Sequence, residues 1–292
     1  MWDSLVRATA DNNNIRVSAA ITTRLVEEAR QRHQTSPVAS AALGRVLTGV
    51  LLLSWNLKDK GSITMRVLGD GPLGGVIADV NAQGQVRGYI QNPQVDLPPN
   101  KHGKLDVGGG IGQGNLYITT DLGLKDTYTG SVALETGEIG EDLAKYLVIS
   151  EQTPSLVSVG VLVNPDLTIA AAGGIIVQAL PNGSPEVLTK IEENLQNLKP
   201  ISTLIKEGNS AQDIIKLYLK DIEVKFLEEK QINFNCPCNK ERLEKIMISL
   251  GKDELEDIIN NEGSSEVKCH FCNEHYYFTK EELEKLLVEA SK

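Results

Sequence analysis

The chain has 292 residues, enough to bury more than one hydrophobic core, and 41% of them are hydrophobic and 23% charged, as in an ordinary globular protein. Its 29 basic and 39 acidic residues give a net charge of −10, so no positive field attracts a nucleic-acid backbone. The N-terminal sequence lacks the basic and apolar regions of a secretion signal, and the most apolar run, residues 46–55, is too short to span a bilayer. We therefore expect a cytoplasmic protein that binds neither nucleic acid nor membrane.

The first predicted elements are a strand and two helices. Residues 15–21 have the composition of a strand, and Thr22 or Thr23 is placed to cap a helix that follows it. Ser36 as the cap and Pro37 at the first helical position are a strong start signal for the second helix. That helix is apolar over most of its circumference, so we expect other elements to cover it on several sides.

From position 61 the hydrophobic pattern changes to alternation, which predicts strands separated by Gly, Asn, Asp and Pro turns. The strand candidates are residues 63–67, 76–80, 85–90, 116–120, 127–134, 156–163 and 167–177. Residues 139–152 form a helix candidate between them. Many strands with few helices predict an α+β fold, in which the helices pack on a mainly antiparallel sheet.

Two glycine-rich segments resemble phosphate-binding loops but lack the required context. Residues 69–74 match the dinucleotide fingerprint, yet an alternating strand pattern follows them where a helix is needed, so we predict a β-hairpin connection. Residues 108–114 lack the Lys-Ser/Thr of a P-loop and are predicted to be a flexible loop. No nucleotide is expected as a ligand.

The Pro- and Gly-containing segment 180–185 marks the clearest domain boundary. We predict an N-terminal core domain at residues 1–181, a helical linker at 182–230 and a C-terminal domain at 231–292. The linker helices are amphipathic. The pattern favours a helical layer packed on the N-terminal sheet, with a hinge that changes partners as the alternative.

The C-terminal part is predicted to begin with a hairpin formed by residues 222–227 and 231–234. Residues 241–250 and 253–259 follow as short helices, and Thr279 with Glu282 forms a capping box for a last helix at 281–289.

The four cysteines of the chain are Cys236, Cys238, Cys269 and Cys272. Two close pairs joined by a longer segment are typical of a tetrahedral zinc site, with each pair on a tight turn. Clustered cysteines in a chain without a secretion signal favour metal binding over a disulfide scaffold. We therefore predict one zinc ion held by these four residues, with no open coordination position for a substrate.

The residues around the cysteines suggest that the metal is structural. Residues 231–292 contain few apolar side chains, so bound zinc is expected to supply much of their stability. His270 and His275 lie beside the second pair, but four sulfurs complete the ligand set, so we expect these histidines at the surface or behind the ligands. Lys240 and Lys268 lie next to the pairs and could favour the thiolate form.

The first cysteine pair permits two interpretations of the site. Only Pro237 separates Cys236 from Cys238, whereas structural zinc turns place roughly two to four residues between their cysteines. A disulfide between residues so close is strained and belongs to the labile, regulatory class. The site is therefore either an inert structural zinc site, as the four-sulfur set suggests, or a zinc cross-link that is lost when the cysteines are oxidised.

The cysteine spacing resembles the signature of the 33 kDa heat shock protein family, the redox-regulated holdase chaperones. This signature is CxC, a 30-residue segment and CxxC. Upstream segments are also similar to recurrent family segments, and the resemblance spans essentially the whole chain in family order. The similar segments are residues 112–116, 128–132, 150–154 and 173–181.

The resemblance implies an N-terminal α/β core, a helical linker and a zinc domain that is inactive when reduced. It implies that peroxide with mild unfolding joins Cys236 to Cys238 and Cys269 to Cys272, releases zinc and destabilises the linker. The product would be an active homodimer that holds unfolding client proteins without ATP. Such a protein is a chaperone and not an enzyme.

Two other functions stay open from the sequence. A zinc ribbon that binds nucleic acid or a partner protein is disfavoured by the acidic composition. A thiol-disulfide oxidoreductase that uses Cys269 and Cys272 would need a thioredoxin-like βαβ setting, which the sequence around this pair lacks.

Overall fold

The computed structural model describes residues 2–58, 60–181 and 185–290. Their contacts form two compact units, Met1–Asn235 and Cys236–Lys292, which are described separately. The boundary expected around 182–184 lies outside the described residues, so the predicted division into core, linker and C-terminal domain stays a prediction.

One layer of the first unit is a five-stranded antiparallel sheet. Its strands in spatial order are β10 (Val224–Gln231), β1 (Ser4–Ala10), β2 (Ile15–Ile21), β9 (Ile169–Ala179) and β8 (Ser155–Val163). The three strands predicted in this sheet, β2, β8 and β9, are confirmed. No element is predicted for residues 4–10. These residues form β1, which pairs with β2, its neighbour in sequence, on one side and with the distant β10 on the other.

A second sheet has six strands. In spatial order they are β11 (Asn233–Phe234), β5 (Gln85–Ile90), β4 (Gly75–Asn81), β3 (Ser62–Gly69), β6 (Gly114–Asp121) and β7 (Tyr128–Ala133). All neighbours are antiparallel except β11 and β5, which are parallel. Residues 69–74 join β3 to β4, so the predicted hairpin connection is confirmed and no dinucleotide fingerprint is built there.

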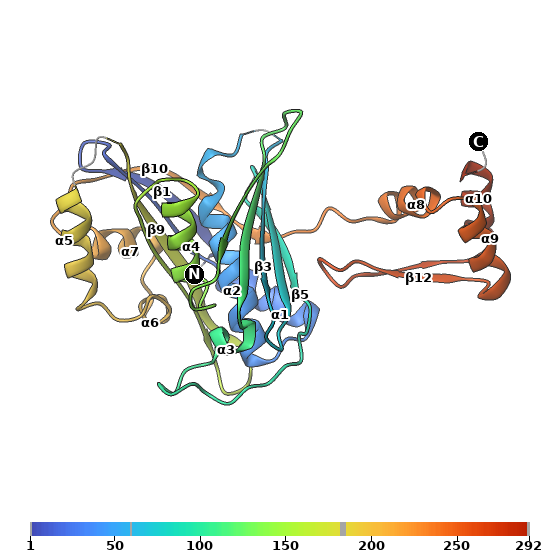
Figure 1. The fold of residues 1–292 in the computed structure, drawn as a ribbon, viewed down its shortest axis with the longest axis horizontal. Helices are drawn as coiled ribbons and strands as arrows, with labels where there is room; N and C mark the ends of the chain where they lie inside the picture. Colours follow the sequence, from blue (N-terminus) through green and yellow to red (C-terminus); the bar gives the residue numbers. More distant parts are fainter. Residues whose placement is uncertain (1, 59, 182–184, 291–292) are drawn as a thin grey trace. The chain divides into compact units, whose positions relative to one another are not determined.

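Helices α1 (Thr23–His33), α2 (Pro37–Leu52) and α4 (Gly140–Ile149) pack between the two sheets (Figure 1). Ser36 caps α2 as predicted, since its hydroxyl accepts a hydrogen bond from the Ala39 N–H at 3.4 Å. Helix α2 continues into a short 3-10 turn, Leu53–Asn56. By length and composition alone Pro37–Trp55 would be able to cross a membrane, but 83% of this window is buried in the fold, which is the pattern of a core helix.

Helices α5 (Pro185–Leu195), α6 (Ile201–Lys206) and α7 (Ala211–Tyr218) cover the opposite face of the five-stranded sheet (Figure 1). Their apolar side chains and those of the sheet form one buried cluster, in which Ile191, Ile201 and Ile214 represent the three helices. The structure therefore has the helical layer that the amphipathic pattern favours.

Two sequence predictions in this unit are wrong. Residues 108–114 are not a loop throughout, because Val107–Ile111 form the short helix α3, which Asp106 caps by accepting from the Gly109 N–H at 3.0 Å. Residues 222–234 do not form a hairpin. Strand β10 runs through the predicted turn and pairs with β1, and β11 joins the other sheet beside β5.

The second unit contains α8 (Lys240–Ser249), α9 (Lys252–Asn261), β12 (Ser265–Lys268), β13 (His275–Phe278) and α10 (Lys280–Ala290). The predicted capping box is confirmed, because the Thr279 N–H donates to Glu282 Oε2 at 3.0 Å and the Glu282 N–H to Thr279 Oγ1 at 3.4 Å. The apolar core is small. Its buried side chains are Leu243, Met247, Leu255, Ile259, Phe278, Leu283 and Leu286.

The start of α1 is capped by Asp3, the residue before β1, and not by Thr22 or Thr23, which were predicted as caps from the sequence. Thr22 precedes the helix, but its hydroxyl bonds to that of Thr48 at 2.7 Å and caps nothing. The carboxylate of Asp3 accepts from the N–H groups of Arg24 at 3.1 Å and Leu25 at 2.7 Å. Asp3 is buried, which raises its pKa, whereas these two hydrogen bonds lower it.

We expect Asp3→Ala to lower the free energy of unfolding of the first unit by about 1–2 kcal/mol, because the buried N–H of Leu25 and the partly buried N–H of Arg24 lose their acceptor. Both tryptophans, Trp2 and Trp55, lie in this unit, so their fluorescence during a urea titration follows its unfolding. The control is Asp96→Ala, at an exposed aspartate. Equal unfolding midpoints for the two variants would contradict the capping role.

Candidate metal centre

The second cysteine pair lies on the turn of a small hairpin. Strands β12 and β13 pair up to Lys268 and His275, and Cys269 begins the connection between them. The Cys269 N–H donates to the Glu274 carbonyl at 2.9 Å, and the Asn273 N–H donates to the Cys269 carbonyl at 2.8 Å. Asn273 has a φ of 62°, a left-handed conformation that asparagine tolerates better than most residues. This local sequence therefore bends the chain so that Cys269 and Cys272 lie on one turn.

The first pair lies on the segment that precedes α8. Asn239 caps this helix by accepting from the Arg242 N–H at 2.8 Å, which fixes the chain direction immediately after Cys238. Pro237 restricts the backbone between the two cysteines, because its ring fixes φ. The pair is thus restrained by the rigid residue within it and by the helix cap that follows it.

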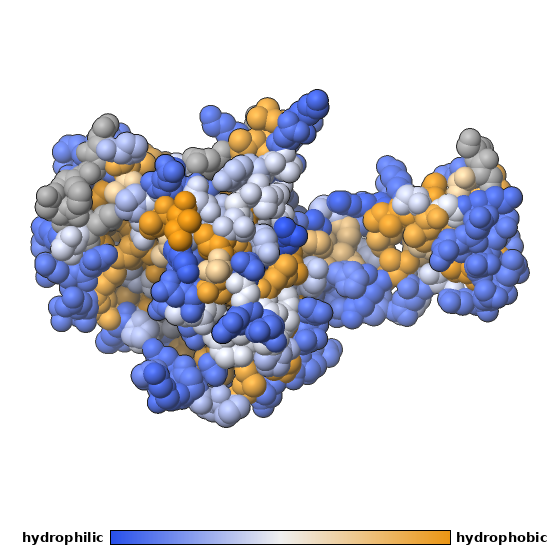
Figure 2. All heavy atoms as spheres, in the orientation of Figure 1, coloured by the Kyte–Doolittle hydropathy of each residue, from blue (hydrophilic) through white to orange (hydrophobic). Residues whose placement is uncertain are grey.

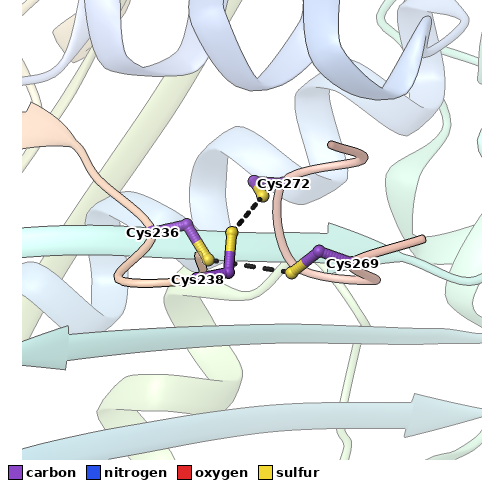
Figure 3. Close-up of side chains that lie close together, drawn as sticks. All are labelled: Cys236, Cys238, Cys269 and Cys272. Carbon is purple, nitrogen blue, oxygen red and sulfur yellow. Dashed lines mark hydrogen bonds between the residues drawn. The ribbon is translucent and has the colours of Figure 1, made fainter. Parts of the chain in front are cut away.

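The structure brings the four cysteine sulfurs together, all within 4.8 Å of one another (Figure 3). The Cys236 and Cys269 sulfurs are 3.8 Å apart, and those of Cys238 and Cys272 are 3.2 Å apart. A tetrahedron with metal–sulfur bonds of about 2.3 Å separates its sulfurs by about 3.8 Å. The donor set and its dimensions therefore fit a metal ion held by four thiolates.

The charge state of the sulfurs depends on such an ion. Cys272 is buried and the other three are half-buried, and burial raises the pKa of Cys238 and of Cys272 above that of a free thiol. Several thiolates packed this closely also repel one another. A bound cation reverses both effects, because it compensates the negative charge directly.

The two histidines beside the second pair do not join the group of potential ligands. His270 is exposed on the turn. His275 is exposed on β13, where its Nδ1 contacts the carboxylate of Glu266 on the paired strand. Lys240 is also engaged elsewhere, since its Nζ lies 2.5 Å from Glu282 Oε1 and over the Phe278 ring.

Tyr276 is the residue at this site that sequence reasoning missed. Its hydroxyl donates to the carbonyl and to the sulfur of Cys238, both at 3.2 Å. The alternation of β13 turns Tyr276 towards the cysteines and leaves Tyr277 exposed. The signal available in the sequence was an aromatic hydroxyl on the strand that follows the second pair.

Comparisons with known proteins agree over nearly the whole chain. The model of the family described as Hsp33 protein matches residues 3–279. The 33 kDa chaperonin of Desulforamulus reducens is 52% identical over 287 residues, with 98% of each chain covered. That of Bacillus subtilis is 48% identical over 291 residues, covering 99% of this chain and 100% of the relative.

A solved structure shows the same fold. The crystal structure of the 33 kDa chaperonin from Thermotoga maritima, described as a heat shock protein 33 homolog, matches with a TM-score of 0.92 at 39% identity, covering 100% of this chain and 99% of that one. The predicted α+β fold is confirmed. With its four-cysteine cluster and these relatives, the chain belongs to the Hsp33 family of 33 kDa chaperonins, which are chaperones and not enzymes.

Proposed function

We propose that the protein is a redox-regulated holdase of the cytoplasm that binds unfolding proteins without ATP. The observation that carries the proposal is the cluster of four sulfurs within 4.8 Å, in a unit whose apolar core is small. A unit of this size needs a cross-link to be stable. A chemical change at sulfur therefore becomes a change in folding.

Zinc is the metal that best fits four thiolates in a closed tetrahedral set. When bound, it supplies a single cross-link between the segment before α8 and the turn between β12 and β13. The chain contributes the four sulfur donors, the two turns that aim them and the Tyr276 hydroxyl that supports Cys238. No coordination position is left for a substrate, in keeping with a regulatory role.

Peroxide would convert the sulfurs to disulfides. Each pair of thiols loses two electrons and two protons as it forms one S–S bond, and one peroxide molecule is reduced to two waters. Family resemblance assigns the pairs as Cys236 with Cys238 and Cys269 with Cys272. Two short sulfur–sulfur distances, Cys236 to Cys269 and Cys238 to Cys272, instead join one cysteine of each pair, so mass spectrometry of the oxidised protein is needed to assign the disulfides. Sulfurs joined in disulfides no longer offer thiolate ligands, and the second unit loses its cross-link.

Loss of the second unit would act on the first through the covalent connection. The Asn235 N–H donates to the Val86 carbonyl at 2.9 Å, one residue before Cys236. Strand β10 and helices α5–α7 precede this point and cover one face of the five-stranded sheet. If they loosen, the apolar cluster beneath them becomes available to clients and to a second copy, which supports the proposed active homodimer.

The surface of the first unit already carries separate apolar areas among polar ones (Figure 2). Exposed apolar side chains occur on the β6–β7 connection, at the start of β7 and at the end of α4. They are Leu122, Leu124, Tyr128, Val148 and Ile149. These side chains are few, whereas α5–α7 cover one contiguous apolar cluster, so uncovering that cluster would supply the larger binding surface.

Cys272→Ser should abolish binding of one zinc ion per chain and unfold the second unit, because a buried ligand is lost and the remaining core is too small. Atomic absorption measures the zinc, and NMR of α8–α10 measures folding, while tryptophan fluorescence should show the first unit intact. His275→Ala is the matched control and should retain zinc. Zinc retained by Cys272→Ser, or lost from His275→Ala, would contradict the four-sulfur assignment.

Tyr276→Phe should weaken zinc binding by about 10-fold, because Cys238 loses a hydrogen bond that supports its ligating sulfur. Competition with a chromophoric chelator measures the affinity. Tyr277→Phe, one position along the same strand and exposed, should leave the affinity unchanged. Equal affinities for both variants would show that the Tyr276 contact has no influence on the metal.

Peroxide at elevated temperature should remove four free thiols and release one zinc ion per chain, because each ligand is consumed in a disulfide. The oxidised protein should then suppress light scattering by an aggregating denatured client. Peroxide treatment of Cys272→Ser separates oxidation from metal loss, since that variant starts without zinc. Zinc release from the unaltered protein without suppression of aggregation would refute the holdase proposal.

A further inference from the structure

A cavity lies between the two sheets of the first unit. Its volume is about 420 Å³, within the range of roughly 300–1,000 Å³ that is typical of ligand sites. Gln178 lines it from the five-stranded sheet, and Ile63 and Ile118 line it from the six-stranded sheet. The 3-10 turn after α2 contributes Trp55, and the end of α4 contributes Leu147. The two isoleucines and Leu147 are buried, so the inner wall of the cavity is apolar and already formed.

The mouth of the cavity carries exposed apolar side chains. Leu122 on the β6–β7 connection is 52% exposed, Tyr128 at the start of β7 is 58% exposed, and both line the cavity. Leu124 lies between them in sequence and is exposed as well, but it lies outside the lining. Apolar surface that is left in water favours association with an apolar partner. An apolar group that enters the cavity would thus contact apolar side chains both at its mouth and at its inner wall.

The charged residues of the lining are one base, Arg16, and two acids, Asp126 and Glu151. Arg16 is engaged within the fold, because its Nε donates to Gln178 Oε1 at 2.8 Å. Burial lowers the pKa of Arg16, and the nearby charge of Glu151 offsets part of this shift, so these two charges balance each other. Asp126 is exposed, and its side chain forms no ion pair or hydrogen bond with another described residue. Lys125 lies outside the lining, so the mouth has one carboxylate in excess.

We propose that this cavity binds an unfolded client segment in which a bulky apolar residue lies next to a basic residue. The apolar side chain would enter the cavity, and the basic side chain would lie against Asp126 at the mouth. The net charge of −10 on the whole chain favours the approach of basic segments in the same way. This inference rests on the proposed holdase function and specifies a class of client and a place where it binds.

The charge at the mouth favours a basic client segment over the other possible occupants. Two copies of this chain that met at their cavity mouths would bring their Asp126 carboxylates together, and each copy carries a net charge of −10. A small apolar molecule would fill the inner part of the cavity but leave Leu122, Tyr128 and Asp126 in water. A chain segment with an apolar and a basic residue contacts the inner wall and the mouth at once.

The cavity does not depend on the elements that are proposed to loosen on oxidation. Its lining contains no residue of α5–α7, of β10 or of the second unit. It is therefore available in the reduced protein, unlike the apolar cluster beneath α5–α7. Its small size predicts weak binding by itself. A client that also reached the uncovered cluster would be held at two places on one chain, which strengthens attachment without making either contact stronger.

The test uses a short peptide in which one lysine lies between a phenylalanine and a leucine, flanked by glycine and serine. In the reduced, full-length protein, methyl NMR should show shift changes at Ile63, Ile118 and Leu147 but not at Ile191 and Ile214 beneath α5–α7. A matched peptide with glutamate in place of lysine should bind about 3-fold more weakly. A peptide with serines in place of phenylalanine and leucine should bind at least about 10-fold more weakly.

Two variant pairs test the mouth from the protein side. Leu122→Ser should weaken binding of the lysine peptide about 5-fold, because an apolar contact at the mouth is lost, whereas Leu124→Ser on the same connection should not. Asp126→Asn should weaken the lysine peptide about 3-fold and make its affinity equal to that of the glutamate peptide. Asp96→Asn, at an exposed aspartate outside the lining, should change neither affinity. All four positions are exposed, so these variants should fold like the unaltered protein.

The outcomes distinguish this inference from the holdase proposal. Equal binding of the lysine and glutamate peptides to the unaltered protein, or shift changes only outside the cavity, overturns the inference even if the oxidised protein suppresses aggregation. Shift changes at Ile63 and Ile118 that depend on protein concentration without peptide assign the mouth to a second copy and also overturn it. Binding of the lysine peptide in the cavity of a protein that never suppresses aggregation supports the peptide site and refutes the holdase proposal alone.

Discussion

The second unit depends on holding four sulfur atoms within 4.8 Å of one another. Burial raises the pKa of Cys238 and of Cys272, and the hydrogen bond from Tyr276 offsets this only in part at Cys238, so a cation is the group that would balance four thiolates at this distance. The sulfurs come from two segments with α8 and α9 between them, so their cross-link closes a loop that contains much of the unit. Binding of a metal at these sulfurs would therefore be coupled to folding in this part of the chain.

The position of the cysteines in the chain explains how unfolding of the second unit could affect the first. Cys236 follows Phe234 and Asn235, which are held at the edge of the six-stranded sheet beside β5. Immediately before them, β10 forms the charged edge of the other sheet. A segment of few residues thus links both sheets to the sulfur cluster. If the second unit unfolds, the C-terminal end of this segment is no longer held, and β10 loses a restraint. This effect requires no direct contact between the two units.

The sequence predicted the elements whose signals are local. The start of α2 is specified by Ser36 and Pro37, and the turn between β3 and β4 by its glycines, and both were found where expected. The misses have nonlocal causes. Strand β10 is rich in charged residues, and it is a strand because β1 pairs with it across more than 200 positions of sequence, as the Arg7–Glu228 hydrogen bond with a separation of 221 shows. Asp3 caps α1 from outside the helix, which no capping pattern near Thr22 reveals.

At the cysteine site, too, the sequence predicted the local feature and missed the nonlocal one. The spacing of the cysteines was sufficient to group them, because ligand spacing is a local property of two turns. Tyr276 escaped notice because its role depends on which face of β13 meets Cys238, and this is set by the pairing of β13 with β12. The face of a strand changes with every residue, so a shift of one position would have placed Tyr277 at the sulfur. Support around a ligand is therefore fixed by register, whereas the ligands themselves are fixed by sequence.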